Sequence, residues 1–152
     1  MKKYFLLAVF LFSFVGPTNA QLLKVGLNGG ISGGARELVD PAIIVDVAYF
    51  FQTNNNLQVG AVSGYSHTFK NISDLQYIPV GGGVRYEFNR FGLGADIGYA
   101  IVINGGSGGS LYYAPRMGFE INDKVAIMAS YRGLTTFFSN WDIVALGVEL
   151  GL

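Results

Sequence analysis

Apolar and polar residues alternate along eight stretches of the chain with a period of two. Successive side chains of a β-strand point to opposite faces, so this period predicts eight strands, each with one apolar and one polar face. Most have the length of ~9–11 residues that a tilted strand needs to cross a bilayer. The predicted strands are Leu22–Ser32, Ala42–Gln52, Leu57–His67, Gln76–Phe88, Phe91–Ile103, Leu111–Ile121, Val125–Gly133 and Asp142–Leu152.

The links between these strands alternate between short and long. "TNNN", "NR" and "ND" are short and polar, as in tight hairpins, whereas "GGARELVD", "TFKNISD", "NGGSGG" and "LTTFFSN" are longer. This order is typical of up-and-down membrane barrels, whose short turns face the periplasm. We therefore predict an all-β fold: an eight-stranded antiparallel up-and-down transmembrane β-barrel with both chain ends on the periplasmic side.

The charged residues of the strands share the polar face. Alternation alone would also allow a soluble barrel with its apolar face inside. The interior of an eight-stranded barrel is just wide enough for side chains to fill it. Leu, Ile, Val, Phe and Tyr dominate the apolar face and are too large for that space, whereas the polar face is mainly glycine, alanine and serine with a few charges. We therefore predict that the apolar face meets lipid and that the charges lie in the lumen.

Ten charged residues are assigned to the lumen in this way. Asp142 is the one strand charge whose position in the alternation belongs to the apolar face. Charges kept away from water must be paired, so we predict a closed lumen around an Arg85–Asp96–Arg116 network. Glu87, Glu120, Lys24 and Glu149 are the further members that we expect in this network. The ten residues are Lys24, Arg85, Arg116, Lys124, Arg132, Asp46, Glu87, Asp96, Glu120 and Glu149.

Aromatic residues of the apolar face fall into two bands, as expected where lipid headgroups meet a barrel. The band near the short turns is Tyr49, Phe51, Tyr86, Phe88, Phe91 and Phe119, and the band towards the long links is Tyr65, Tyr99, Tyr113 and Tyr131. Pro79 and Pro115 lie inside predicted strands, although proline cannot donate to a ladder. We expect a bulge, or a lower strand rim, at both prolines.

Composition and the first residues agree with an exported membrane barrel. Hydrophobic residues make up 51% of the 152, charged residues 13%, and 22 are glycine. Residues 1–20 have the basic start, apolar stretch and small-residue end of a signal peptide, which leaves residues 21–152 as one barrel domain in the bacterial outer membrane. Without Lys2 and Lys3 there are 8 basic and 10 acidic residues, a charge of −2 that argues against nucleic-acid binding. The absence of cysteine excludes disulfides and thiolate metal sites.

The chain resembles the small outer-membrane β-barrel domain family common in Bacteroidota. "LQYIPVGGGVRYEF" at Leu75–Phe88, the signal peptide and the last strand "IVALGVELGL" carry the resemblance, which covers essentially all of residues 21–152. The resemblance implies the barrel fold and the outer-membrane location and names no reaction. The chain ends in Leu152, where many such barrels have an aromatic residue.

No constellation of residues in the sequence supports catalysis. Some eight-stranded outer-membrane barrels deacylate lipid A with a histidine and a serine two positions apart on one strand. The single histidine, His67, has Tyr65 and Phe69 at those positions, and Ser66 faces the other way. The glycine-rich stretches lack the lysine of a phosphate-binding loop, and the acids are dispersed among bases. We predict no enzymatic activity, no cofactor and no metal site.

Two hypotheses about function follow. The first is a structural or partner-binding barrel with a closed lumen, and the alternative is a small pore or carrier for a compact solute. The equal numbers of lumenal acids and bases favour pairing and hence the first. We expect outer-membrane lipids as partners, together with an unknown protein or small molecule at the long links. Phe69, Phe137, Phe138 and Trp141 are the candidate contact residues there.

Overall fold

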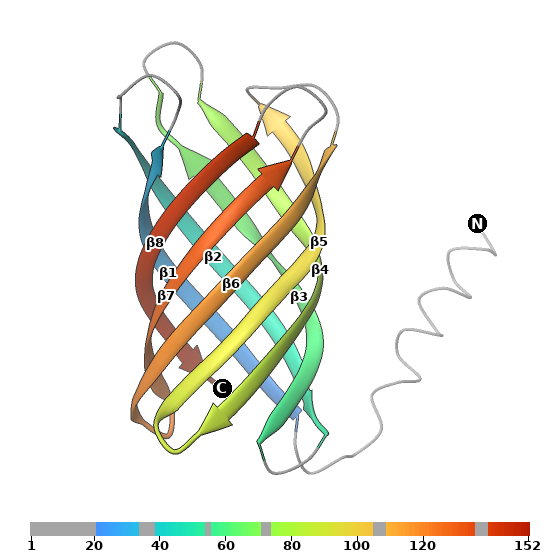
Figure 1. The fold of residues 1–152 in the computed structure, drawn as a ribbon, viewed down its shortest axis with the longest axis vertical. Helices are drawn as coiled ribbons and strands as arrows, with labels where there is room; N and C mark the ends of the chain where they lie inside the picture. The colour runs from blue at the N-terminus through green and yellow to red at the C-terminus, as the bar shows by residue number, and fades with distance from the viewer. Residues whose placement is uncertain (1–20, 34–38, 54–55, 71–73, 105–108, 136–139) are drawn as a thin grey trace, which may run out of the picture.

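The computed structural model describes residues 21–33, 39–53, 56–70, 74–104, 109–135 and 140–152. Eight antiparallel strands follow one another around a closed barrel, and β1 pairs with β8 to complete it (Figure 1). The strands are β1 (Gln21–Gly33), β2 (Val39–Gln52), β3 (Leu57–Thr68), β4 (Leu75–Phe88), β5 (Phe91–Asn104), β6 (Gly109–Asn122), β7 (Val125–Thr135) and β8 (Asn140–Gly151). The predicted fold class is confirmed. The described residues include no helix long and apolar enough to cross a bilayer.

Short polar turns close the hairpins at the end of the barrel where β1 begins and β8 ends (Figure 1). Between Phe88 and Phe91, which pair directly, Asn89 adopts φ 54°, a left-handed conformation that asparagine tolerates. In the β6–β7 turn the Asn122 side chain accepts hydrogen bonds from two backbone N–H groups that follow it, at 2.9 and 3.0 Å. We refer to this end as periplasmic, following the rule for short turns.

Lys124 belongs to the β6–β7 turn and is exposed there, so its predicted place in the lumen is wrong. The strand ladder shifts register between Glu120 and Asn122, which breaks the period of two before the turn is reached. Lys124 itself precedes β7, which begins at Val125, so the alternation of that strand does not extend to it. The lumen is left with four basic side chains against five acidic ones.

The outward face of the barrel is an apolar belt. Its mid-strand residues are highly exposed, as shown by Leu27 at 62%, Ile97 at 63% and Leu146 at 63%. Towards the periplasmic end the rings of Phe88, Phe91 and Phe119 form a connected band, with centroid distances of 6.5 and 5.2 Å. An exposed apolar surface of this extent and height is suited to hydrocarbon and not to water.

Neither proline produces a bulge, contrary to expectation. The β3–β4 ladder keeps one register from Ser63–Val80 to Ser66–Tyr77, and only the two pairs between them, where Pro79 lies, are absent. The β6–β7 ladder likewise omits two pairs at Pro115 without a shift. The missing N–H therefore interrupts the ladder on one side of each proline and leaves strand alignment intact. The shifts occur elsewhere, at Gln76/Tyr77 between β4 and β5 and at Glu120/Asn122 between β6 and β7.

The lumen has an apolar layer at the extracellular end and a charged layer that reaches from the middle to the periplasmic mouth. Within the charged layer, Ala48, Phe50 and Val62 form a second, smaller apolar cluster. The inner face is thus less uniformly small and polar than the sequence suggested. Bulky residues such as Tyr77, Tyr112 and Ile143 are almost fully buried in the apolar layer. The members of this layer are Ala42, Ile44, Leu75, Tyr77, Ala100, Tyr112, Ala114, Leu134, Ile143 and Ala145, with Val102 and Trp141 packed against them.

The closed ladder gives a first testable prediction. A barrel without free edges resists detergent until it is heated, so the unboiled protein should migrate differently in a detergent gel from the boiled protein. It should also stay with membranes after a carbonate wash. Recovery in the soluble periplasmic fraction would instead require the apolar belt to be covered by something other than lipid.

Candidate functional site: the charged lumen

Asp96 on β5 lies between two arginines in the middle of the charged layer. Its Oδ1 is 2.6 Å from Nη1 of Arg85 and its Oδ2 is 2.7 Å from Nε of Arg116. The Asp96 side chain is 0% exposed. Arg85 also donates from Nη1 to the carbonyls of Val84, at 2.9 Å, and Ala95, at 3.4 Å. The structure thus brings together the three residues at the centre of the predicted network.

Asp46 on β2 forms a second centre of charge. Arg132 on β7 binds it with two nitrogens, Nη1 to Oδ1 at 2.9 Å and Nη2 to Oδ2 at 2.6 Å. Arg116 Nη2 reaches Asp46 Oδ2 at 3.3 Å, and the Asn28 side chain donates to the same oxygen at 2.9 Å. Such two-pronged pairing of arginine with a carboxylate fixes geometry as well as charge. Because Arg116 contacts both Asp46 and Asp96, the two centres are one network.

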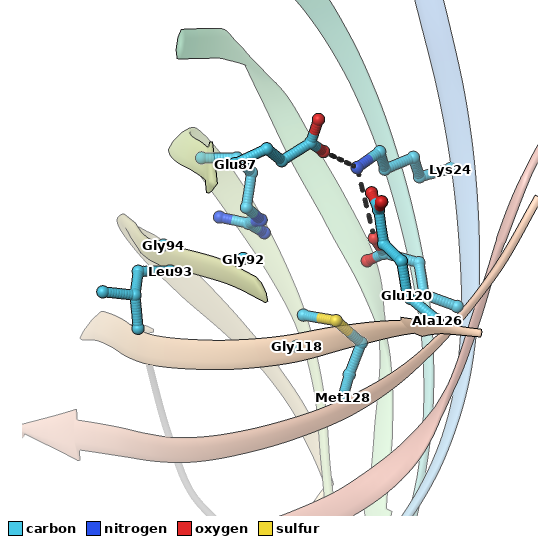
Figure 2. Close-up of a pocket in the computed structure, with 11 residues that line it drawn as sticks. Lys24, Glu87, Gly92, Leu93, Gly94, Gly118, Glu120, Ala126 and Met128 are labelled. Atoms are coloured by element: carbon cyan, nitrogen blue, oxygen red, sulfur yellow. Dashed lines mark hydrogen bonds and ion pairs between the residues drawn. The ribbon is translucent and has the colours of Figure 1, made fainter. Parts of the chain in front are cut away.

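Lys24 on β1 connects this network to the periplasmic mouth. Its Nζ is 3.0 Å from Glu87 Oε1 and 3.6 Å from Glu149 Oε1, and Glu149 Oε2 lies 3.9 Å from Arg116 Nη1. Figure 2 shows Lys24 and Glu87, which meet beside a small cavity that Glu149 also lines. The cavity volume is about 30 Å³, enough for a very few water molecules.

Glu120 lines the cavity, half-buried, and differs from the other predicted members of the network. Among the described residues it forms no ion pair, so we do not include it in the network. Its place at the mouth lets water solvate the carboxylate, and no charged partner is required there.

Glycines create the space that the central charges occupy. A Cβ on Gly94 would come within 2.5 Å of Cδ of Arg85, and one on Gly83 would come within 2.6 Å of Oδ1 of Asp96. Both glycines face the lumen on β5 and β4, beside the ion pair. The alternation of glycine with large outward residues in these strands is therefore needed for charge pairing as well as for a narrow barrel.

Parity placed Asp46 and Arg132 in the lumen, but nothing in the sequence pointed to their contact. They belong to β2 and β7, which are not neighbours in the ladder. Contacts across a lumen depend on the stagger of the strands, because stagger decides which residues of distant strands lie at the same height. The contact could have been predicted only from the exact register of every hairpin. The register shift at Glu120/Asn122 means that this register cannot be read from the alternation of the sequence.

At the extracellular rim Phe69, one of the candidate contact residues, lies beside His67. Nε2 of His67 is 3.0 Å from Oδ2 of Asp74, and its Nδ1 is 3.4 Å from the hydroxyl of Tyr65. Phe69 is exposed and stacks on the imidazole at a centroid distance of 4.3 Å. A hydrogen bond from the backbone N–H of Lys70, together with His67, holds the pKa of the Asp74 carboxyl below its ordinary value. These contacts attach the start of the β3–β4 link to the barrel rim.

Trp141 packs against the apolar layer of the lumen, so it is only partly available as a contact residue. The ammonium of Lys70 lies 3.4 Å from the centroid of its ring, a cation–π contact. Phe137 and Phe138 lie outside the described residues.

The geometry does not support a nucleophile pair at His67. Ser66 is fully buried on the lumenal side of β3, whereas His67 belongs to the outer face. Within the part of the chain that the structure describes, no group of three or more histidine or acidic side chains is arranged to hold a metal ion.

Comparison with solved structures shows the same fold at low identity. The attachment invasion locus protein Ail of Yersinia pestis superposes with a TM-score of 0.64 at 15% identity, over 88% of this chain and 99% of Ail. A de novo designed transmembrane β-barrel gives 0.57 at 17% identity, over 86% and 95%. Neisserial surface protein A gives 0.52 at 15% identity, over 86% and 96%. No protein-family model and no curated protein sequence matches the chain.

At this low identity the similarity concerns the fold alone, and a designed barrel with no natural function superposes about as well as natural ones. The location follows when the fold is combined with the surface. A closed antiparallel barrel leaves no ladder edge in lipid, and its exposed belt is apolar between two aromatic bands. Such barrels are built for bacterial outer membranes, and the protein is an integral protein of that membrane.

Proposed function

We propose that the protein is a sealed, non-enzymatic outer-membrane barrel that acts structurally or through a partner bound at its extracellular links. The observation that carries the proposal is the chain of ion pairs across the lumen, from Glu87 and Lys24 through Glu149 and Arg116 to Asp96 and Asp46. A solute would have to separate buried ion pairs to pass this layer, and leaving a buried charge without its partner is strongly unfavourable.

The apolar layer above the charges opposes the pore alternative independently. Tyr77 and Tyr112 lie side by side there, with ring centroids 6.4 Å apart, and both are at most 1% exposed. A solute that left the charged layer would next meet close-packed apolar side chains. Two successive barriers of opposite character are consistent with a plug and poorly suited to conduction.

Partner binding would use the extracellular rim. Phe69 is exposed on the outer face, and Lys70 and Asp74, which contact Trp141 and His67, add one charge of each sign beside it. Residues 1–20 are proposed as the signal peptide that directs export, and membership of the Bacteroidota-type barrel family stays a prediction.

Electrical recording tests the sealed lumen. In a planar bilayer the refolded protein is expected to show no steady single-channel conductance, because the ion pairs and the apolar layer block the path. A barrel without Asp96 is expected to leak small ions, since two arginines then lose a shared partner and water can enter. A well-resolved, steady conductance in the parent protein would favour the pore alternative.

A further inference from the structure

Strands β5 to β8 carry an apolar groove on the lipid-facing side of the barrel. It consists of two adjoining hollows of about 430 and 270 Å³, and Leu93, Met117 and Ala129 line both. Gly92 and Gly118 contribute to the lower hollow, where the absence of side chains deepens the surface. The lower hollow is lined entirely by apolar residues and glycine. We call the two hollows together the β5–β8 groove.

The groove begins in the periplasmic half of the membrane, and its upper hollow reaches past the level of Leu146 at the midplane. Its lower end is formed by Phe91 and Phe119, which belong to the aromatic band at the short turns. Its upper end is formed by Pro115, Tyr131 and Val144, which lie near the middle of β6, β7 and β8. The hydrocarbon beside the lower hollow is the acyl chains of the periplasmic leaflet.

Two exposed cations stand at the periplasmic mouth of the groove. Arg90 is in the β4–β5 turn, and its carbonyl accepts a hydrogen bond from Glu120 N at 2.8 Å, which holds this turn beside β6. Lys124 is exposed in the β6–β7 turn, next to the exposed acid Asp123. The remaining short link, Thr53–Asn56, contains no basic residue. Arginine and lysine at this level extend their charges to the headgroup region.

We propose that the β5–β8 groove binds one acyl chain of an anionic phospholipid of the periplasmic leaflet, with the phosphate held by Arg90 and Lys124. A chain in the groove contacts apolar side chains on both flanks, whereas a chain on a convex stretch of the barrel contacts one surface only. The position of the two cations, at the turns that border the groove, provides the complementary charge for the phosphate. The inference rests on the outer-membrane location and is independent of whether the lumen is sealed.

Photolabelling of the purified protein in vesicles tests the site. The vesicles contain phosphatidylethanolamine with a small fraction of phosphatidylglycerol bearing a diazirine on its acyl chain, and adducts are mapped by peptide mass spectrometry. Labelling is expected to concentrate on the groove residues of β5 to β8. Ala129→Phe fills the groove and should reduce that labelling several-fold. Ala61→Phe is the matched control, because Ala61 is an outward alanine on β3, directly opposite β7 in a ring of eight.

The two cations are tested separately. Arg90→Gln and Lys124→Gln should each lower labelling by the phosphatidylglycerol probe about fivefold, which corresponds to ~1 kcal/mol for each basic residue near an anionic lipid surface. Labelling by a zwitterionic probe with the same acyl chain should change less. If the two cations bind the phosphate of an anionic lipid, their loss must reduce labelling by the anionic probe more than labelling by the zwitterionic probe.

Equal labelling around the whole barrel would overturn the proposal, and so would unchanged labelling in Ala129→Phe. Crosslinks between protein copies at the groove would assign it to a second barrel instead. Each variant is first checked for its heat-dependent gel shift, and Ala129→Leu replaces Ala129→Phe if the larger residue prevents folding. None of these outcomes alters the membrane location or the sealed lumen, which are tested by fractionation and conductance.

Discussion

Replacing Asp96 with alanine is expected to lower the unfolding free energy of the barrel by about 3–5 kcal/mol, the range found when one partner of a buried ion pair is removed. The carboxylate is the shared partner of Arg85 and Arg116, at 2.6 and 2.7 Å, and its side chain is 0% exposed. Arg116 keeps Asp46 and Glu149 as partners. Arg85 retains only carbonyl contacts among its described interactions with polar groups, so most of the loss should arise there.

The measurement is equilibrium unfolding by denaturant of barrels refolded in vesicles, followed by the fluorescence of Trp141, the single tryptophan. Asp123→Ala is the control, since this carboxylate is exposed in the β6–β7 turn. The pH must be kept where all carboxylates are ionised, so that both proteins are compared in one charge state. A loss for Asp96→Ala no larger than that of the control would mean that the arginines find other partners in the lumen.

Replacing Leu146 with arginine is expected to cost roughly 2–4 kcal/mol, the range for a cation on the lipid face at the bilayer midplane. Leu146 pairs with Gly29 and Ala129 in the middle of β8 and is 63% exposed. Ala129→Arg, on the neighbouring strand, should behave similarly. The guanidinium can reach water only by bending along the barrel, which is difficult from this depth.

Val39→Arg is a control matched in exposure. Val39 is also 63% exposed but starts β2 at the extracellular rim, where the expected cost falls to about 0–1 kcal/mol. Unfolding free energies of the three variants in vesicles therefore separate depth from exposure. Unchanged stability of Leu146→Arg and Ala129→Arg would mean that these residues do not face hydrocarbon, and the assignment of the two faces would be reversed.

Strand number, order and facing could be predicted because each depends on local sequence. The period of two fixes which side chains share a face, and tight polar links fix the hairpins. Strand ends at the extracellular side could not be predicted as well. β2 begins at Val39 and β6 at Gly109, before the predicted starts at Ala42 and Leu111. The ladder extends into residues such as Asp40, Pro41 and Ser110, whose types are commoner in links, because the partner strand is already in place beside them.

Ion pairing in the lumen could be predicted only in part, for a geometric reason. Arg85 and Asp96 lie on neighbouring strands, so hairpin register was enough to bring them together. Asp46 and Arg132 meet across the barrel, where the contact depends on the stagger of all the strands between them. Pro79 and Pro115 were misjudged because a missing donor was equated with a bulge, whereas the strands keep their alignment and lose two ladder pairs.

The two-layered lumen has a consequence for assembly. A barrel that enters the outer membrane from the periplasm advances with its extracellular end in front, and the interior of that end is filled by residues such as Ile44, Tyr112 and Ile143. Most of the arginines and carboxylates of the lumen follow behind, and Arg132, which pairs with Ile143, directs its guanidinium back to Asp46. Transfer of a charge through hydrocarbon is among the most unfavourable steps in membrane insertion. Placing most of the lumenal charges in the trailing half means that few of them have to traverse the full thickness of the bilayer.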